Sequence, residues 1–272
     1  MIDQVKQKIN ELLSQGSVKG VVALAYAHGH AGPCLFQKGD DLDALCLGDE
    51  KKAGDVRYPL NKVLITLARQ YPDDVFGVLV RGCDERGLYG LYRLKQLEPD
   101  KVVPIGISCP RDLALACECK KPWPDDMTAG EAPNEKESSG TEQKGVQDVE
   151  GKEQPERFDF WKDQFLKCVK CYGCRDICPM CFCYDCSLEC EDLVSKGDLP
   201  VDIPTFHLVR AMHMADRCID CGLCDEACPV DIPLRLLYKK TAEVMNHEFG
   251  FTSGINKNEI SPLSLMGPMP EK

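Results

Sequence analysis

A cysteine pattern that occurs twice constrains this chain more than any other feature of its sequence. Twelve of the 18 cysteines fall between Cys168 and Cys228, and eight of them form two copies of Cys-x2-Cys-x2-Cys-x3-Cys-Pro. The first copy comprises Cys168, Cys171, Cys174 and Cys178, and the second comprises Cys218, Cys221, Cys224 and Cys228. A disulfide framework suits a small secreted chain, whereas this density in a reducing compartment indicates thiolates that bind metal.

The spacing of the two copies is that of bacterial ferredoxins with two 4Fe-4S clusters. In such proteins three cysteines of one short turn hold three corners of a cube, and the cysteine before proline crosses to the other cluster. The pattern therefore predicts one cluster on Cys168, Cys171, Cys174 and Cys228, and a second on Cys218, Cys221, Cys224 and Cys178. Two zinc sites are the alternative, although zinc sites rarely repeat an eight-cysteine order.

The segment 179–217 between the copies is longer than a ferredoxin connection requires, and it opens with four more cysteines. These are Cys181, Cys183, Cys186 and Cys190. A third cluster is the preferred interpretation, followed by a zinc site and then by free thiols. Cys174, Cys178 and Cys181 also match the spacing of radical S-adenosylmethionine enzymes, but the repeat already uses the first two and no long barrel follows.

Hydrophobic patterning predicts a small α/β domain with a parallel sheet over residues 1–120. A helical period at the N-terminus is followed by a continuous apolar run over 21–27, which is typical of a buried strand. A strand over 75–80, a helix over 84–97 and a strand over 102–107 come next. This order implies parallel pairing through a right-handed crossover.

Four cysteines of this domain gather at one predicted edge of the sheet. Cys83 follows the strand over 75–80 and Cys109 follows the next strand, so both lie at the carboxyl edge where such folds bind ligands. Cys117 and Cys119 come shortly afterwards and can fold back to the same edge. A further cluster on these four cysteines is one interpretation, and packed structural thiols are the other.

The remaining segments differ sharply in composition. Residues 121–157 hold ten acidic and five basic residues, which predicts an acidic flexible linker. Residues 158–249 are expected to form an α+β ferredoxin module of the bacterial type, with the cysteine-rich segment 179–217 inserted in it. The tail over 250–272 has little periodicity and is expected either to follow a partner subunit or to be flexible.

Charge and composition argue against several functional classes. The net charge of −11 opposes binding to nucleic acid, and it therefore also argues against an iron-sulfur module that processes nucleic acid. No apolar run approaches the roughly 18 residues that span a bilayer, and the N-terminus lacks signal-peptide order, so a soluble cytoplasmic protein is expected. We find no pattern typical of catalytic residues, and we interpret His207 and His213 as capping or packing residues.

Several blocks of the sequence resemble the beta subunit family of coenzyme F420-reducing hydrogenases and formate dehydrogenases. They are residues 78–84 (VLVRGCD), the Cys109-Pro110 turn, the stretch 117–120 (CECK) and the module over 168–228. The resemblance covers most of residues 60–240. It is closest to the shortened iron-sulfur members that accompany heterodisulfide reductase-like complexes in anaerobes.

The resemblance implies a subunit that carries single electrons between a catalytic dehydrogenase or hydrogenase subunit and a flavin-containing, heterodisulfide reductase-like partner. Long family members have a further domain for flavin and deazaflavin, but here mostly the acidic linker separates Cys119 from Cys168, so that domain is expected to be missing. The expected role is therefore a relay without substrate chemistry of its own, in a cytoplasmic multisubunit oxidoreductase. The alternative is a subunit that binds flavin and reduces a deazaflavin or nicotinamide carrier.

Overall fold

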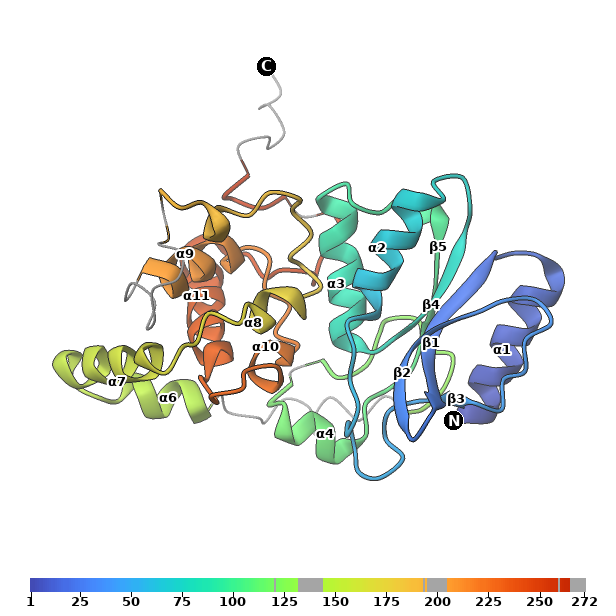
Figure 1. The fold of residues 1–272 in the computed structure, drawn as a ribbon, viewed down its shortest axis with the longest axis horizontal. Coiled ribbons are helices and arrows are strands. Elements are labelled where there is room, and N and C mark those ends of the chain that lie inside the picture. The colour runs from blue at the N-terminus through green and yellow to red at the C-terminus, as the bar shows by residue number, and fades with distance from the viewer. Residues whose placement is uncertain (120, 132–143, 193, 195–204, 259, 265–272) are drawn as a thin grey trace, which may run out of the picture. The chain divides into compact units, whose positions relative to one another are not determined.

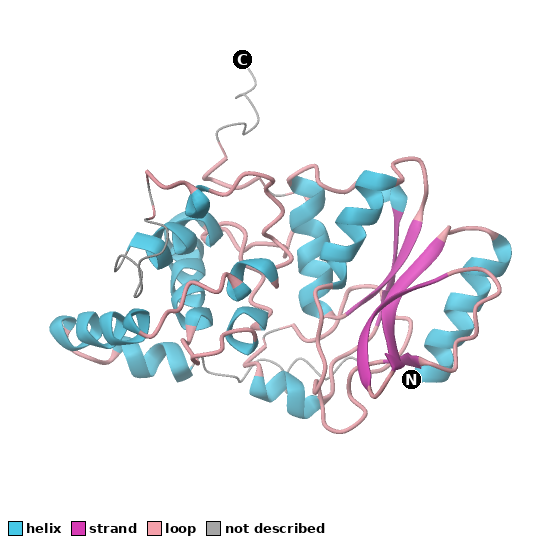
Figure 2. Cartoon of the chain, in the orientation of Figure 1, coloured by secondary structure: helices cyan, strands magenta, loops and turns pink. Residues whose placement is uncertain are grey.

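The computed structural model of the chain contains two compact units, Met1–Thr141 and Glu142–Lys272. The structure describes residues 1–119, 121–131, 144–192, 194, 205–258 and 260–264. Figure 1 shows a sheet with helices packed against it in the first unit, and Figure 2 shows the second unit as helices and loops.

A mixed sheet forms the centre of the first unit. Its strands are β1 (Gly20–Ala27), β2 (His30–Phe36), β3 (Leu45–Cys46), β4 (Phe76–Val80) and β5 (Val102–Gly106). The order is β2-β1-β4-β5, with β3 also paired to β1. The β1–β4 and β4–β5 pairs are parallel, which confirms the strand-helix-strand unit predicted over 75–107.

The prediction of a parallel sheet holds for β1, β4 and β5 only, because β2 and β3 pair with β1 in the antiparallel direction. The chain reverses at His28 and Gly29, whose φ angles of 53° and 86° are those that a two-residue hairpin turn requires. The strand pattern of β2 is weakened by Gly32 and Pro33, which are poor strand formers, and the sequence pattern therefore does not indicate this strand.

Helices cover both faces of this sheet. They are α1 (Ile2–Gln15), α2 (Leu60–Gln70) and α3 (Gly82–Arg93), and a shorter helix α4 (Arg111–Ala116) follows β5. Figure 1 shows α1 on one face and α2 with α3 on the other. Every residue of β4 is buried, as expected for a strand with helices on both sides.

Residues 121–131 return to the carboxyl edge of the sheet. Ala129 forms a parallel bridge with Ile107, and the Cys109 N–H donates to the carbonyl of Pro122 at 2.8 Å. Pro122, Pro124 and Ala129 are buried there. These few apolar side chains pack this segment of the predicted linker against the edge of the sheet.

The rest of the predicted linker is also structured where it is described. Helices α6 (Lys144–Glu150) and α7 (Gln154–Leu166) occupy most of it, and Val146, Val149 and Phe165 are buried. The apolar residues in this stretch are few, but they lie at positions that share a helix face. Residues 132–143 of the predicted linker lie outside the described part of the chain.

Helices and loops build the second unit. Besides α6 and α7 they are α8 (Gly173–Asp176), η2 (Ser187–Glu189), α9 (Thr205–Met214), α10 (Leu223–Glu226) and α11 (Leu234–Phe249). No strand forms among the residues described in this unit, so the α+β prediction for the module is wrong for them. The segment after the second motif is rich in Leu, Lys and other helix formers and continues as α11.

The described part of the tail packs on its own unit. Phe251 is 2% exposed and clusters with Ala215 and Met245. The beginning of the tail is therefore held by this chain itself, and residues 265–272 of the predicted tail lie outside the described part. No helix among the described residues combines the length and apolar character needed to cross a membrane.

The packing of 121–131 against the sheet gives a first prediction. A Cβ on Gly106 would overlap the carbonyl oxygen of Asp126 and lie 2.7 Å from Pro124 Cγ, so we expect Gly106→Ala to lower the free energy of unfolding by about 1–3 kcal/mol. Gly32→Ala in β2 is the matched control, because nothing lies within 4 Å of its added Cβ. Urea denaturation can be followed by Trp123 fluorescence in a Trp161→Phe background. Equal midpoints for the two variants would contradict this packing.

Candidate metal centres

Each copy of the cysteine motif folds into the same kind of loop, followed by one short helical turn, α8 or α10. The φ angles of Lys170 and Tyr172 in the first copy are 50° and 58°, and those of Asp220 and Gly222 in the second are 55° and 79°. Left-handed residues at these positions turn successive backbone N–H groups toward one side, an arrangement that binds anions. The spacing of the cysteines thus produces two equivalent anion-binding loops.

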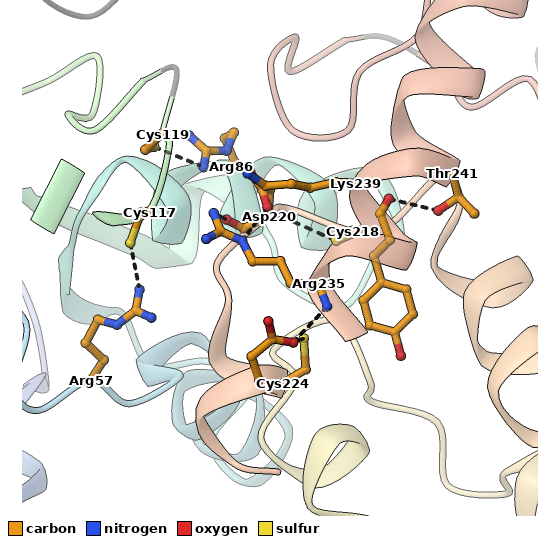
Figure 3. A network of polar contacts seen from close by, with 12 residues as sticks. Arg57, Arg86, Cys117, Cys119, Cys218, Asp220, Cys224, Arg235, Lys239 and Thr241 are labelled. Atoms are coloured by element: carbon orange, nitrogen blue, oxygen red, sulfur yellow. Dashed lines mark hydrogen bonds and ion pairs between the residues drawn. The ribbon is translucent and has the colours of Figure 1, made fainter. Parts of the chain in front are cut away.

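Backbone N–H groups in these loops point at cysteine sulfurs. Gly173 donates to Cys171 Sγ, Asp220 to Cys218 Sγ and Ile232 to Cys228 Sγ, each at 3.4 Å. Figure 3 shows the second of these bonds beside Arg235, whose Nε lies 2.6 Å from Asp220 Oδ1. Hydrogen bonds from backbone amides stabilise sulfur in its anionic form.

The first motif loop and the last cysteine of the second copy line one pocket. Cys168, Cys171, Cys174 and Cys228 all contribute to its wall, together with His207 of α9. The pocket encloses about 330 Å³, part of it open to solvent. The structure therefore brings together the four cysteines that the crossed arrangement assigns to the first cluster.

A second pocket has the complementary composition. Cys218, Cys221 and Cys224 of the second copy line it with Cys178 of the first, and it encloses about 360 Å³, part of it open to solvent. Arg210 of α9 and Tyr238 of α11 complete its wall. The fourth cysteine of each copy thus lies in the pocket of the other copy, and iron ligation by these eight cysteines remains a prediction.

Burial affects the protonation of these thiols. It raises the pKa of Cys174 to about 11 and that of Cys218 to about 12, and it raises the pKa of Cys224 as well. A hydrogen bond with Cys181, followed by burial, raises the pKa of Cys178. Since iron binds thiolates, we expect cluster assembly to be coupled to the release of protons.

Three buried side chains around the pockets have polar atoms without a hydrogen-bond partner among the described residues. They are both ring nitrogens of His207, Nε of Arg210 and the hydroxyl of Tyr238. Buried polar groups are normally paired, so these atoms indicate that the pockets hold a polar group. An iron-sulfur cube supplies negative charge and sulfide acceptors, and the residues present therefore fit such a group.

The four cysteines of the insert differ in their surroundings. Cys181 Sγ accepts a hydrogen bond from Arg210 Nη1 at 3.1 Å and interacts with Cys178, while Cys183 and Cys190 are exposed. Among the described residues, no group of three or more Cys, His, Asp or Glu converges on a single metal-ion position. The structure connects Cys181 to the second pocket, and a third cluster on Cys181, Cys183, Cys186 and Cys190 remains a prediction.

The sheet-edge cysteines of the first unit lie beside arginines. Nη1 of Arg57 lies 3.8 Å from Cys117 Sγ and Nη2 of Arg86 lies 3.9 Å from Cys119 Sγ (Figure 3). Burial raises the pKa of Cys109 to about 11, while a hydrogen bond from Arg81 opposes this rise and the neighbouring Cys119 adds to it.

The positions of two of these cysteines follow from the parallel strands. The β4–β5 register pairs Val80 with Gly106, so Cys83 in the first turn of α3 and Cys109 after β5 follow adjacent strand ends, as expected. Metal binding by Cys83, Cys109, Cys117 and Cys119 remains a prediction.

Sequence reasoning missed Arg210. It is the one cation in the apolar run 206–212 of α9, and a lone arginine in a buried helix is a signal that a charged group lies nearby. The packing interpretation of His207 agrees with its 2% exposure and its stacking on Phe165 at 4.6 Å between ring centroids. Its position on the wall of the first pocket comes only from the tertiary structure. His213 is exposed.

Comparison with known proteins agrees with these observations. The 4Fe-4S binding domain family matches residues 212–233, which include all four cysteines of the second copy. The F420-dependent formate dehydrogenase subunit beta of Methanocaldococcus jannaschii is 41% identical over 103 residues, which are 38% of this chain and 27% of the relative. The F420-dependent formate dehydrogenase 1 subunit beta of Methanococcus maripaludis is 36% identical over 110 residues, 40% of this chain and 28% of that protein.

Part of this chain is therefore similar to the beta subunits of F420-dependent formate dehydrogenases. This agrees with the resemblance predicted from the sequence, and the chain spans little more than a quarter of the length of these two proteins. An uncharacterized ferredoxin of Methanocaldococcus jannaschii is also 35% identical over 81 residues. The match covers 24% of this chain and 49% of the ferredoxin.

The exchange of cysteines between the pockets gives a second prediction. Cys171 and Cys228 line the same pocket, so we expect Cys171→Ser/Cys228→Ser to keep the second cluster and to lose only about four iron atoms per chain relative to the wild type. The matched variant Cys171→Ser/Cys178→Ser damages both pockets and is expected to lose both clusters. Iron and labile sulfide are counted after anaerobic purification. If Cys171→Ser/Cys178→Ser retained more iron per chain than Cys171→Ser/Cys228→Ser, each copy would ligate its own cluster and the exchange would be contradicted.

Proposed function

We propose that this chain is an iron-sulfur electron relay subunit of a cytoplasmic, formate dehydrogenase-like complex. The observation that carries this proposal is the pair of pockets, each lined by three cysteines of one motif copy and the fourth cysteine of the other. A 4Fe-4S cube bound in such a pocket is a one-electron carrier. The similarity to beta subunits of formate dehydrogenases supports a place in such a complex.

The arrangement of the pockets suits transfer from one to the other. Cys174 lines the first pocket and Cys178 the second, and the two cysteines are only four positions apart in the sequence, at the short helix α8. Four helical residues advance the chain by about 6 Å, so this segment holds the two sites close together. Arg210 also contacts both regions, since it lines the second pocket and donates to the Cys174 carbonyl at 2.7 Å.

The exposure of the cysteines indicates where electrons would enter or leave. Cys171 of the first pocket is exposed, whereas Cys178 and Cys224 of the second are buried. A redox partner that docks at Cys171 therefore reaches the first pocket most directly. The net charge of −11 favours a partner with a basic docking surface, because complementary charge accelerates association.

The proposed donor is a catalytic subunit of the formate dehydrogenase or hydrogenase type, and the proposed acceptor is a flavin-containing, heterodisulfide reductase-like protein. Oxidation of formate to carbon dioxide releases one proton and two electrons. This chain would pass the two electrons singly, without substrate chemistry of its own.

We test this proposal with the anaerobically purified chain. It is expected to contain about eight or more iron atoms with equivalent sulfide, and its visible absorption is expected to bleach when formate and a catalytic formate dehydrogenase subunit are added. The Cys171→Ser/Cys178→Ser variant should contain about eight iron atoms fewer per chain than the wild type, and Cys34→Ser should behave as the wild type because Cys34, in β2, lines neither pocket. A colourless wild-type chain, or zinc in place of iron, would contradict the proposal.

We further propose a cluster at the sheet edge of the first unit, on Cys83, Cys109, Cys117 and Cys119. Its support is the group of arginines that approach these thiols, with Arg81 on Cys109, Arg57 on Cys117 and Arg86 on Cys119. Guanidinium groups stabilise thiolates and offset the negative charge of a cluster. Arg81 is only 8% exposed and is held in place by Asp49 at 2.7 Å, so its position is well defined.

The sheet-edge cluster gives a further prediction. Cys109→Ala is expected to lower the iron content by about four atoms per chain, because Cys109 is one of its four proposed ligands. Cys46→Ala, which removes a buried thiol of β3, is the matched control and should leave the iron content unchanged. An unchanged iron content in Cys109→Ala would mean that the sheet-edge thiols are structural.

A further inference from the structure

Arg210 of α9 is a buried cation at the centre of the second unit. The residue is 2% exposed. Its Nη2 donates to the carbonyl of Cys174 at 2.7 Å, and its Nη1 donates to Cys181 Sγ at 3.1 Å. Its guanidinium also lies over the ring of Tyr238, 5.6 Å from the centroid. The side chain thus contacts the first motif loop, the insert and α11.

The charge of Arg210 acts on thiols of both pockets. Burial raises the pKa of Cys174 in the first pocket and of Cys224 in the second, and the positive charge of Arg210 opposes the rise at both sites. Arg210 also opposes the rise in the pKa of Cys178, which lines the second pocket. The geometry gives the same result, because Arg210 lines the second pocket and donates to the carbonyl of Cys174 in the wall of the first, so a single cation lies next to both groups of cysteines.

Arg210 differs from the other buried cation of this unit in lacking an acidic partner. Lys239 is 4% exposed, and its Nζ lies 3.9 Å from Asp220 Oδ2. Among the described residues, no carboxylate lies within 4.0 Å of the Arg210 guanidinium, and its Nε has no hydrogen-bond partner. An unpaired charge in a buried position is strongly unfavourable, so the surroundings of Arg210 require a source of negative charge.

We propose that Arg210 is the common counter-charge of both clusters and raises the reduction potential of each. This inference rests on the proposed relay function, because it requires iron-sulfur clusters in both pockets. Addition of an electron makes a cluster more negative, and a fixed positive charge nearby stabilises the reduced form more than the oxidised form. The position of Arg210 between the cysteines of the two pockets extends this effect to both clusters.

The test compares variants that differ in charge at this position. In Arg210→Met we expect the ratio of reduced to oxidised cluster at a fixed ambient potential to fall about tenfold for both clusters, a shift of about 59 mV for a one-electron carrier. Arg210→Lys keeps the charge and should restore most of this ratio. Lys239→Met is the matched control and should shift the potentials less, because Lys239 lines neither pocket and its Nζ lies 3.9 Å from the carboxylate of Asp220. The potentials are read from anaerobic redox titrations followed by electron paramagnetic resonance.

The outcomes separate this inference from the relay proposal. A wild-type chain without clusters would contradict the relay function itself. Unchanged potentials in an Arg210→Met protein with full iron content, or a shift of one cluster alone, would overturn the role of Arg210 while leaving the relay intact. If Arg210→Met loses iron, the iron content per chain is compared between Arg210→Met and Arg210→Lys instead of the potentials. Arg210→Lys is then expected to keep both clusters, and equal loss from the two variants would overturn the proposal.

Discussion

The exchange of the fourth cysteine between the two motif copies is the constraint on which the second unit depends. Cys178 lies in the pocket of the second copy and Cys228 in that of the first, so neither loop forms a complete site alone. The two loops also pack closely, since a Cβ on Gly173 would lie 3.0 Å from the Ala227 carbonyl oxygen. Metal binding and folding of this unit are therefore expected to be strongly coupled.

Buried positive charge is a second common element of the structure. The chain as a whole is acidic, yet Arg81 in the first unit and Arg210 in the second are both buried next to cysteines. Arg81 is balanced by Asp49, whereas the described surroundings of Arg210 provide thiols and a carbonyl. Acidic groups on the surface and guanidinium groups near the thiols suit a protein that holds anionic clusters inside and docks to basic partners.

Much of the fold follows from local pattern. The buried strand over 21–27 and the unit over 75–107 are present as predicted, because long apolar runs and helical periods report burial directly. The hairpin strand β2 and the helices α6 and α7 were not apparent, because weak or acidic segments become ordered only by packing against the rest of the chain. The described part of the second unit is helical because α9 and α11 pack on each other, and the helix formers after the second motif favour α11 locally.

The candidate chemistry of this protein can be inferred from local spacing: the number, order and spacing of the cysteines match two iron-sulfur motifs, because ligand geometry depends on a few residues that are near in the chain. Long-range packing shows in addition which cysteines share a pocket, and that Arg210 and His207 of α9 lie on the pocket walls. The arginines beside the sheet-edge thiols, such as Arg57 next to Cys117, also come from the structure alone. These residues are distant in sequence, and their proximity arises from long-range packing that local spacing does not encode.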